Sequence, residues 1–584
     1  MPDTILCGLD PEQRAVAEVT RGPVCVLAGA GTGKTRAITY RIAYAIQTGA
    51  VDPRHVLAVT FTTRAAGELR ARLRTLGGSG ADRVQARTFH AAALRQLVYF
   101  WPAAVGGEPP RVVDSKRGLV AAAASRLGLK LAGAGLRDAA TEIEWAKTVQ
   151  SRPEDFVAVA GQANRVPPVP LEDMAKLFDA YEQVRRDSHV LDFESMLELT
   201  AGILASDGVA AAQVRDQYRY FVVDEYQDVN PLQKLLLDTW LGGRDDLCVV
   251  GDPNQTIYSF TGATPAFLTG FIAEYPAATV IRLVRDYRST PQVVELANRL
   301  VTGSRGAELI AQRRDGPPPS FAEYPDEAAE AAAVAAQARE LIDGGVRAKK
   351  IAVLVRTNAQ TAGFERALQA AGVPYAVRGA ERFFDRPEVR QAIVLLRAAA
   401  KSAEPPAAAA VAHVLSGLGM TPEPPPTGGA MRDRWESLAA LAQLAADLFG
   451  ARPDATLADL GDELADRASL QHAPTLDGVT IASLHAAKGL EWDVVFLPTL
   501  VDGVVPIVHA RTPDAIDEER RLLYVAVTRA RERLLLSWSK ARSHGARRSR
   551  RPSPFLQPFF QQNGSRGLSR PPSAGAPGGE QDAR

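Results

Sequence analysis

Residues 24–35, which read VCVLAGAGTGKT, decide the fold class of this 584-residue chain. The apolar run Val24–Leu27 is typical of a buried parallel strand, and Arg36–Ile46 has helical spacing. Glycines between a strand and a helix let backbone N–H groups turn toward phosphates. A glycine-rich turn without a ligand is the alternative. We expect a phosphate-binding loop made of Ala28, Gly29, Ala30, Gly31, Thr32, Gly33, Lys34 and Thr35, with Ala28 where the strict pattern has glycine.

Short apolar runs recur along the chain, and sequence with helical spacing follows each of them. The first set is Val24–Ala28, Val56–Thr60, Tyr220–Asp224 and Leu247–Asp252. The second set is Thr279–Leu283, Ile351–Val355, Val479–Ser483, Val494–Pro498 and Leu534–Trp538. Strands that alternate with helices predict parallel sheets, so we expect an α/β protein with two cores. The first core is assigned to residues 1–90 and 193–278, and the second to 279–397 and 471–540.

Helical sequence interrupts each expected core. Residues 91–192 predict a helical insertion in the first core, and residues 398–470 a smaller one in the second. The smaller insertion contains the proline-rich pieces Glu404–Ala407 and Pro422–Thr427, which predict a flexible loop. Residues 541–584 start with the basic run Arg542–Arg551, and we expect disorder beyond about Phe560. This basic run is either an auxiliary nucleic-acid contact or a solvated tail.

Composition excludes several classes of protein. The net charge is +1, so a polyanion has to be held by local sites and not by a general positive field. The three cysteines are Cys7, Cys25 and Cys248, which are too far apart for a CxxC metal pair. We find no secretion signal and no window of about 18 apolar residues, so we expect a cytoplasmic protein without a membrane contact.

An acidic pair follows the apolar run that ends at Val223. We expect Asp224 to hold Mg²⁺ together with the Thr35 hydroxyl, and Glu225 to orient and deprotonate the water that attacks the γ-phosphate. Lys34 would neutralise the β- and γ-phosphates. The alternative is a solvated acidic strand end, which is the commoner fate of an isolated Asp-Glu pair.

The string Asp224–Asp228, DEYQD, resembles motif II of UvrD/Rep-type superfamily I DNA helicases. The other motifs of that family have counterparts in the same order. They are Gln13 within Leu9–Val16 (Q motif), Val59–Ala66 (Ia), Thr88–His90 (Ib), Gly251–Tyr258 (III), Asp286–Ser289 (IV), Val355–Gln360, Leu484–Trp492 (V) and Tyr524–Ala530 (VI). The resemblance covers roughly residues 5–540. It implies two RecA-like P-loop cores and translocation along single-stranded DNA from 3′ to 5′, driven by ATP and Mg²⁺.

The resemblance also implies roles for individual residues around ATP. Gln13 would read the adenine edge while Tyr287 stacks on its face, and Glu491 would contact the ribose. Gln255 would sense the γ-phosphate. Arg288 and Arg529 would act as arginine fingers. ATP would then bridge the two cores, so that its binding and hydrolysis close and open a cleft.

For DNA, the resemblance implies stacking residues and phosphate contacts. Phe61, Tyr258 and Phe260 would stack on successive bases. The residues that would touch the strand, mainly its phosphates, are Thr60, Thr62, His90, Arg356, Asn358 and His485. We expect single-stranded and tailed duplex DNA as partners, whereas protein partners are unknown from the sequence.

Four positions depart from the family pattern: Asp286 replaces Asn, Phe260 replaces Trp, Thr261 replaces Arg and Ala526 replaces Gly. The changes at 260 and 261 reduce stacking area and remove a cation, so we expect a weaker grip on DNA at raised salt. The chain most resembles a UvrD paralogue branch of high-GC bacteria, without the C-terminal zinc and helical modules of longer members. The 73-residue span of the second insertion leaves regulation by it open.

Four whole-protein hypotheses follow. The leading one is a DNA helicase in repair or replication, and the second is a translocase that strips proteins from single strands but unwinds weakly alone. A helicase-nuclease would need an acidic nuclease domain after residue 540, where the sequence is rich in Gly, Pro and Arg. A non-catalytic DNA-binding scaffold would be expected to have lost motor residues, whereas Lys34, Glu225 and Arg529 are all present.

Overall fold

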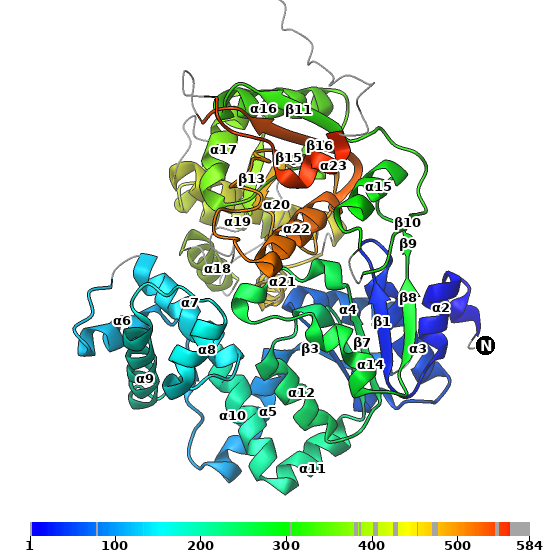
Figure 1. The fold of residues 1–584 in the computed structure, drawn as a ribbon, viewed down its shortest axis with the longest axis vertical. Helices are drawn as coiled ribbons and strands as arrows, with labels where there is room; N and C mark the ends of the chain where they lie inside the picture. The colour runs from blue at the N-terminus through cyan, green and yellow to red at the C-terminus, as the bar shows by residue number, and fades with distance from the viewer. Residues whose placement is uncertain are drawn as a thin grey trace, which may run out of the picture. The chain divides into compact units, whose positions relative to one another are not determined.

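The computed structural model describes residues 3–76, 80–131, 134–303, 306–378, 384, 387–400, 407–423, 430–452, 454–469, 477–542 and 548–560 (Figure 1). The chain forms two compact units. Unit 1 is Met1–Asp286 with Gly303–Leu309, and unit 2 is Tyr287–Thr302 with Ile310–Arg584. Each unit contains a six-stranded parallel sheet, so the predicted α/β class with two parallel-sheet cores is confirmed. No helix among the described residues is long and apolar enough to cross a membrane.

The sheet of unit 1 has the strand order β3-β2-β6-β7-β1-β8, and every neighbouring pair is parallel. The strands are β1 (Val24–Ala28), β2 (Val56–Thr60), β3 (Gln85–Thr88), β6 (Tyr220–Val223), β7 (Leu247–Gly251) and β8 (Thr279–Leu283). Side chains along a strand alternate between the two faces, so the continuous apolar runs of the inner strands supply a core on each side.

Helices cover both faces of this sheet. One core contains side chains of α2 (Pro11–Glu18), α3 (Lys34–Gln47) and α4 (Thr63–Leu76). The other contains side chains of α5 (Phe89–Ala104), α10 (Phe193–Ser206), α11 (Gly208–Gln217) and α12 (Pro231–Leu241). In this second core Trp240 is fully buried, and its ring stacks at 6.0 Å from Phe89 and 6.5 Å from Phe221. The short helices of unit 1 are α1 (Asp3–Leu6), α13 (Ala266–Thr269) and α14 (Phe271–Glu274).

A helical subdomain extends from unit 1 between α5 and α10. It consists of α6 (Arg117–Arg126), α7 (Ala134–Thr148), α8 (Phe156–Gln162) and α9 (Leu171–Asp187), which share a core of their own around Phe156, Phe178 and Tyr181. The short parallel strands β4 (Arg111–Val112) and β5 (Val190–Leu191) pair at its base. The predicted insertion, residues 91–192, therefore consists of two parts: most of α5 packs on the sheet, and α6–α9 form the subdomain.

Unit 2 has the strand order β11-β16-β15-β12-β14-β13, again all parallel. Its strands are β11 (Ser320–Tyr324), β12 (Ile351–Val355), β13 (Tyr375–Arg378), β14 (Val479–Ser483), β15 (Trp492–Leu497) and β16 (Ala530–Ser539). Its helices near the sheet are α15 (Pro291–Leu300), α16 (Glu327–Asp343), α17 (Thr361–Ala370) and α22 (Pro513–Val527). Two further strands of the described residues have only two residues each: β9 (Arg285–Asp286) belongs to unit 1 and β10 (Ile310–Ala311) to unit 2.

The second helical region and the tail belong to unit 2. Helices α18 (Pro387–Ala399), α19 (Ala407–Gly417), α20 (Ala430–Ala451) and α21 (Leu457–Ser469) share a separate core. The proline-rich pieces lie largely outside the described residues, as do residues 543–547 and 561–584 of the predicted tail. Residues 548–560 pack on the unit: α23 (Gln557–Phe560) places the Phe559 and Phe560 rings about the Phe321 ring, and Arg550 pairs with Glu327.

Two expectations about strands need correction. The sequence pattern assigns the run Thr279–Leu283 to the second core, but β8 pairs in parallel with β1 of the first sheet, with Val24 opposite Thr279. An apolar run shows that a strand exists but not which sheet it joins. The strands β3, β11 and β13 were not predicted, because their sequences, QART, SFAEY and YAVR, are not continuous apolar runs.

Candidate functional site

The carboxyl ends of the parallel strands in unit 1 meet at one edge of the sheet, and the predicted site residues of this unit follow those ends. The glycine loop follows β1, Asp224 and Glu225 follow β6, and Gln255 follows β7; these three strands are neighbours. Thr60 ends β2 and His90 comes just after β3, the two strands at the other end of the same row. In such sheets ligands bind at this edge.

The glycine loop has the geometry of an anion site. Gly31 and Gly33 have φ of +70° and +78°, and α3 begins at Lys34 directly after them. The Lys34 side chain is 11% exposed and its Nζ lies 3.8 Å from Glu225 Oε1. Nζ donates no hydrogen bond to any residue that the structure describes. A buried ammonium without a hydrogen-bond acceptor, beside the N-terminus of a 14-residue helix, is suited to a phosphate.

The acidic pair lies next to this loop. Asp224 is buried, and its Oδ2 is 3.5 Å from the Thr35 hydroxyl. Burial, and then the charge of Glu225, raise the pKa of Asp224 to about 7. Glu225 has a φ of +52°, an unusual conformation for a residue with a side chain and one that concentrates at functional sites.

The donor set fits Mg²⁺. A hydroxyl and a buried carboxylate offer oxygen ligands, and Mg²⁺ commonly takes only one or two protein groups besides substrate phosphates and water. In the part of the chain that the structure describes, no three His, Cys, Asp or Glu side chains form a metal cluster.

A buried hydrogen-bond chain connects the acidic pair to the loop after β7. Gln227 donates to Glu225 Oε2 at 2.5 Å, and its own Oε1 accepts the Asp252 backbone N–H at 3.0 Å. Asp252 Oδ2 in turn accepts the Gln255 amide at 2.8 Å. Sequence reasoning assigned no role to Gln227 or Asp252, and their signal was only their place inside two motifs. These hydrogen bonds place Glu225, the general-base candidate, and Gln255, the phosphate-sensor candidate, in one network.

Gln13 is a further predicted site residue that contacts the glycine loop. It is buried on α2, and its Nε2 donates to the Thr32 carbonyl at 3.0 Å. A Cβ on Gly33 would lie 2.6 Å from that same Nε2. The Gln13 amide is therefore packed against the glycine loop itself, where only a glycine leaves it room.

In unit 2 the structure brings three predicted site residues together. Arg288 donates from Nε to Glu491 at 2.6 Å and from NH1 to the Thr528 carbonyl at 3.2 Å. Arg529 is 2% exposed and donates to the Val525 and Leu490 carbonyls. Burial by itself would raise the pKa of Glu491, but the guanidiniums around it lower the pKa. In this arrangement Glu491 holds an arginine-finger candidate, while Tyr287 is 44% exposed.

The DNA candidates of unit 1 differ in exposure. Thr60 is buried and its hydroxyl donates to the Thr62 carbonyl, while the Thr62 hydroxyl accepts the Ala65 N–H. Phe61 is partly buried against the core. The His90 ring lies edge-on to Phe193, with 5.6 Å between the ring centroids, and burial lowers its pKa to about 4.

The aromatic candidates after β7 lie side by side. Tyr258 and Phe260 have ring centroids 6.1 Å apart, and Phe260 is 45% exposed on the short helix η6 (Ser259–Thr261). Tyr258 is only partly exposed, so Phe260 is the ring of this pair that is open to stacking with a flat ligand such as a base.

The DNA candidates of unit 2 follow β12 and β14. Arg356 forms a two-pronged ion pair with Glu519, with NH2 to Oε1 at 2.6 Å and Nε to Oε2 at 3.0 Å, so its charge is already neutralised. Asn358 begins the short helix η8 (Asn358–Gln360) and is exposed. Burial, and then the nearby Arg356, lower the pKa of His485 to about 4.

The fold and these loops define a P-loop nucleotide-binding protein with two parallel-sheet units. Residues 9–276 match the family of the UvrD/REP helicase N-terminal domain, and residues 281–419 and 426–541 match that of the UvrD-like helicase C-terminal domain. Because these matches cover most of the chain, the chain belongs to the UvrD/REP helicase family.

Individual relatives agree with this assignment. The ATP-dependent DNA helicase UvrD2 of Mycobacterium tuberculosis (strain ATCC 25618 / H37Rv) is 50% identical over 579 residues, which are 96% of this chain and 83% of the relative. PcrA of Bacillus subtilis (strain 168), also an ATP-dependent DNA helicase, is 27% identical over 92% of this chain and 84% of its own. The ATP-dependent DNA helicase UvrD1 of Mycobacterium tuberculosis (strain CDC 1551 / Oshkosh) is 29% identical over 93% of this chain and 83% of the relative.

Proposed function

We propose that this ATP-dependent DNA helicase of the UvrD family uses Mg²⁺, moves 3′ to 5′ on single-stranded DNA and opens tailed duplexes during repair or replication. The family supports the helicase activity, and the 50% identity to a mycobacterial UvrD2 supports DNA as the substrate. The direction of movement and the cellular pathway rest on the sequence resemblance alone.

One observation supports coupling between ATP and DNA more than any other. The nucleotide candidates after β1, β6 and β7 and the strand-binding candidates after β2 and β3 follow neighbouring strands of one sheet. The segment after β7 carries both kinds: Gln255 ends the helix η5 (Pro253–Gln255), and Phe260 follows only a few residues later. A change at the γ-phosphate therefore has a short covalent path to the aromatic pair.

The chemistry follows from the side chains around the glycine loop. Lys34 would neutralise the β- and γ-phosphates, and Thr35 and Asp224 would hold Mg²⁺, which stabilises the charge that develops on the phosphates. Glu225 would accept a proton from the attacking water, and the hydrogen bond from Gln227 fixes its carboxylate for that role. Gln255 is oriented for the γ-phosphate by Asp252.

Unit 2 would supply cations for the transition state. Arg288 and Arg529 lie close to the same Thr528 and are held by a carboxylate and by backbone carbonyls. Arginine fingers of other NTPases accelerate hydrolysis by about 10³–10⁵. These arginines belong to unit 2 and the glycine loop to unit 1, and it is the family resemblance that implies that one ATP engages both kinds of group.

The test measures ATP hydrolysis by purified protein with and without single-stranded DNA. It includes Lys34→Ala and, as a matched control, Lys176→Ala, which removes a lysine paired with Asp173 on the surface of α9. We expect DNA to stimulate wild type and the control, and we expect Lys34→Ala to lose hydrolysis. An ATP hydrolysis rate that is the same with and without single-stranded DNA would refute the proposal.

Strand displacement on 3′-tailed and 5′-tailed duplexes then tests direction and unwinding. The proposal predicts displacement of the 3′-tailed substrate only. If DNA stimulates hydrolysis but neither tail supports displacement, the enzyme is a translocase without strand separation of its own. Displacement restricted to the 5′ tail would overturn the proposed direction.

A further inference from the structure

The last turn of α7 contacts the loop that carries Phe260. The Thr148 hydroxyl lies 2.9 Å from the Thr261 carbonyl, and it also lies 2.8 Å from the Trp145 carbonyl within its own helix. Thr148 is only 5% exposed. Gly262, the next residue of the loop, has a φ of +90°, and a Cβ there would lie 2.7 Å from Thr148 Oγ1. Backbone and hydroxyl are thus in direct contact.

A second contact reaches the same loop from the segment that follows α8. Arg165 NH1 lies 3.4 Å from the Phe260 carbonyl. Its other nitrogens form a two-pronged pair with Glu142 of α7 at 3.0 and 2.8 Å, and its guanidinium lies 4.7 Å from the centre of the Trp145 ring. Because three groups fix this guanidinium, Arg165 is a rigid donor to the loop and not a mobile surface cation.

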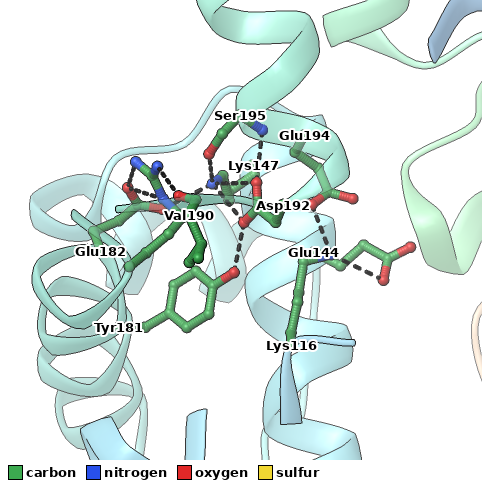
Figure 2. A network of polar contacts seen from close by, with 10 residues as sticks. Lys116, Glu144, Lys147, Tyr181, Glu182, Val190, Asp192, Glu194 and Ser195 are labelled. Carbon is green, nitrogen blue, oxygen red and sulfur yellow. Dashed lines mark hydrogen bonds and ion pairs between the residues drawn. The ribbon is translucent and has the colours of Figure 1, made fainter. Parts of the chain in front are cut away.

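The turn of α7 that carries Thr148 is itself fixed by a buried ionic cluster (Figure 2). Lys147 is 4% exposed and contacts both Asp192 oxygens at 3.0 and 2.8 Å, Glu182 at 2.8 Å and the Ser195 hydroxyl at 2.6 Å. Asp192 also accepts the Tyr181 hydroxyl and the Ser195 N–H as the cap of α10. The cluster joins the helical subdomain to a helix that packs on the sheet.

These contacts have one feature in common. Both carbonyls that the subdomain holds, those of Phe260 and Thr261, belong to η6, whose Phe260 ring remains 45% exposed. Nothing in the nucleotide chemistry requires this attachment, because the Glu225–Gln227–Asp252–Gln255 chain is complete without it. The attachment instead sets the backbone from which an exposed aromatic ring projects.

We propose that Thr148 and Arg165 of the helical subdomain are positioning residues for single-stranded DNA: they clamp η6 so that Phe260 is presented for base stacking. This inference rests on the proposed function, since it takes Phe260 as a stacking residue. A clamped ring loses less conformational freedom when a base binds, and preorganisation of this kind raises affinity without a new contact. Arg165 acts through the loop and not on a phosphate, since Glu142 neutralises it.

The experiment is a double-mutant cycle with a single-stranded oligothymidylate as the probe. Thr148→Val and Arg165→Gln are made alone and together with Phe260→Ala, and Arg126→Gln, which breaks an exposed pair with Asp187 in the same subdomain, is the control. The half-saturating DNA concentration is measured by ATPase stimulation, and the ATPase without DNA gives kcat and KM for ATP. The salt dependence of DNA binding is measured as well.

We expect Phe260→Ala to raise the half-saturating DNA concentration about 5- to 150-fold, the range for losing one stacked base. Thr148→Val and Arg165→Gln should raise it about 3- to 10-fold, with DNA-free kcat and KM within about twofold of wild type and of the control. In the Phe260→Ala background they should add less than about twofold, because the ring they position is gone. Thr148→Val preserves shape, so it decides the outcome if Arg165→Gln is unstable.

Other results would overturn the inference. Effects that multiply with that of Phe260→Ala would show an independent structural role, and a salt slope reduced by about 0.7 in Arg165→Gln would show a direct phosphate contact. If Phe260→Ala leaves DNA affinity unchanged while DNA still stimulates hydrolysis, the clamp has no stacking ring to position, and only this inference fails. If wild type shows no DNA stimulation, the proposed function fails first.

Discussion

Replacing Glu519 by glutamine tests whether a predicted DNA contact is a structural ion pair. In unit 2, Arg356 and Glu519 are 14% and 7% exposed, and three of their nitrogen–oxygen distances lie between 2.6 and 3.2 Å. Glu519 Oε2 also accepts the Ile507 N–H at 3.1 Å. A glutamine at this position would keep the shape and a carbonyl oxygen but would leave the Arg356 charge largely buried and without its carboxylate.

The size of the effect follows from burial. Removal of one partner from a fully buried ion pair costs about 3–5 kcal/mol. This pair is slightly exposed, and water that reaches Arg356 reduces the expected cost to about 2–4 kcal/mol. In a unit of this size each kcal/mol lowers Tm by about 2–4 °C. We therefore expect the unfolding transition of unit 2 to fall by about 5–15 °C in Glu519→Gln, and Arg356→Met with Glu519→Leu should recover most of that loss.

The assay pairs thermal unfolding with DNA binding at several salt concentrations. Arg339→Gln, which breaks the exposed Arg339–Asp343 pair on α16, serves as the control and should shift Tm by less than about 2 °C. If Arg356 stays paired with Glu519, Arg356→Gln leaves the salt slope unchanged. A Tm for Glu519→Gln equal to wild type, with a slope lower by about 0.7 in Arg356→Gln, would refute this reasoning and make Arg356 a phosphate contact.

Three further predictions concern the nucleotide loop, the finger and pH. Gly33→Ala should raise KM for ATP about 5- to 30-fold, since φ is +78° and the new Cβ would displace Gln13; an unchanged KM would contradict this. Arg529→Lys should lower DNA-stimulated kcat about 10³-fold, because a lysine ammonium cannot donate to the Val525 and Leu490 carbonyls in the planar geometry of a guanidinium. A loss below about tenfold would argue against an arginine-finger role for Arg529. Burial lowers the pKa of both His90 and His485 to about 4. As the pH drops from about 6.5 toward 4, these imidazoles are therefore protonated in the unfolded chain before they are protonated in the folded one, and the free energy of unfolding falls. We expect a loss on the order of 1 kcal/mol for each histidine at about pH 5. His90→Gln should flatten the decline of Tm between about pH 7.5 and 5, and an unchanged decline would contradict that role.

The sequence predicted the parts of the fold that depend on local pattern. The apolar runs at Val24–Ala28, Val56–Thr60 and Ile351–Val355 are strands with those bounds, and the glycine loop does lie between a strand and a helix. Continuous burial on both faces produces an apolar run that can be recognised without any tertiary information. The family was likewise predicted from ordered motifs and is confirmed.

Features that depend on partners distant in sequence were not predicted. The assignment of β8 to the first sheet depends on its pairing with β1, which no local pattern encodes. The neutralisation of Arg356 by Glu519 and the clamp of Arg165 on the Phe260 carbonyl join residues roughly 160 and 95 positions apart. A motif indicates which side chains are present, whereas only the packed structure shows what each one already holds.

The strand order of unit 1 also has a consequence for synthesis of the chain. Strand β1, which leads into the glycine loop, lies between β7 and β8, and more than 200 residues separate Ala28 from Leu247. At about 5–20 residues per second, the ribosome needs roughly 11–45 s to produce the first neighbour of β1. During that time the apolar strand β1 has neither of its neighbouring strands. An incomplete chain therefore cannot form the candidate ATP site, and it presents an apolar segment that chaperones would have to shield.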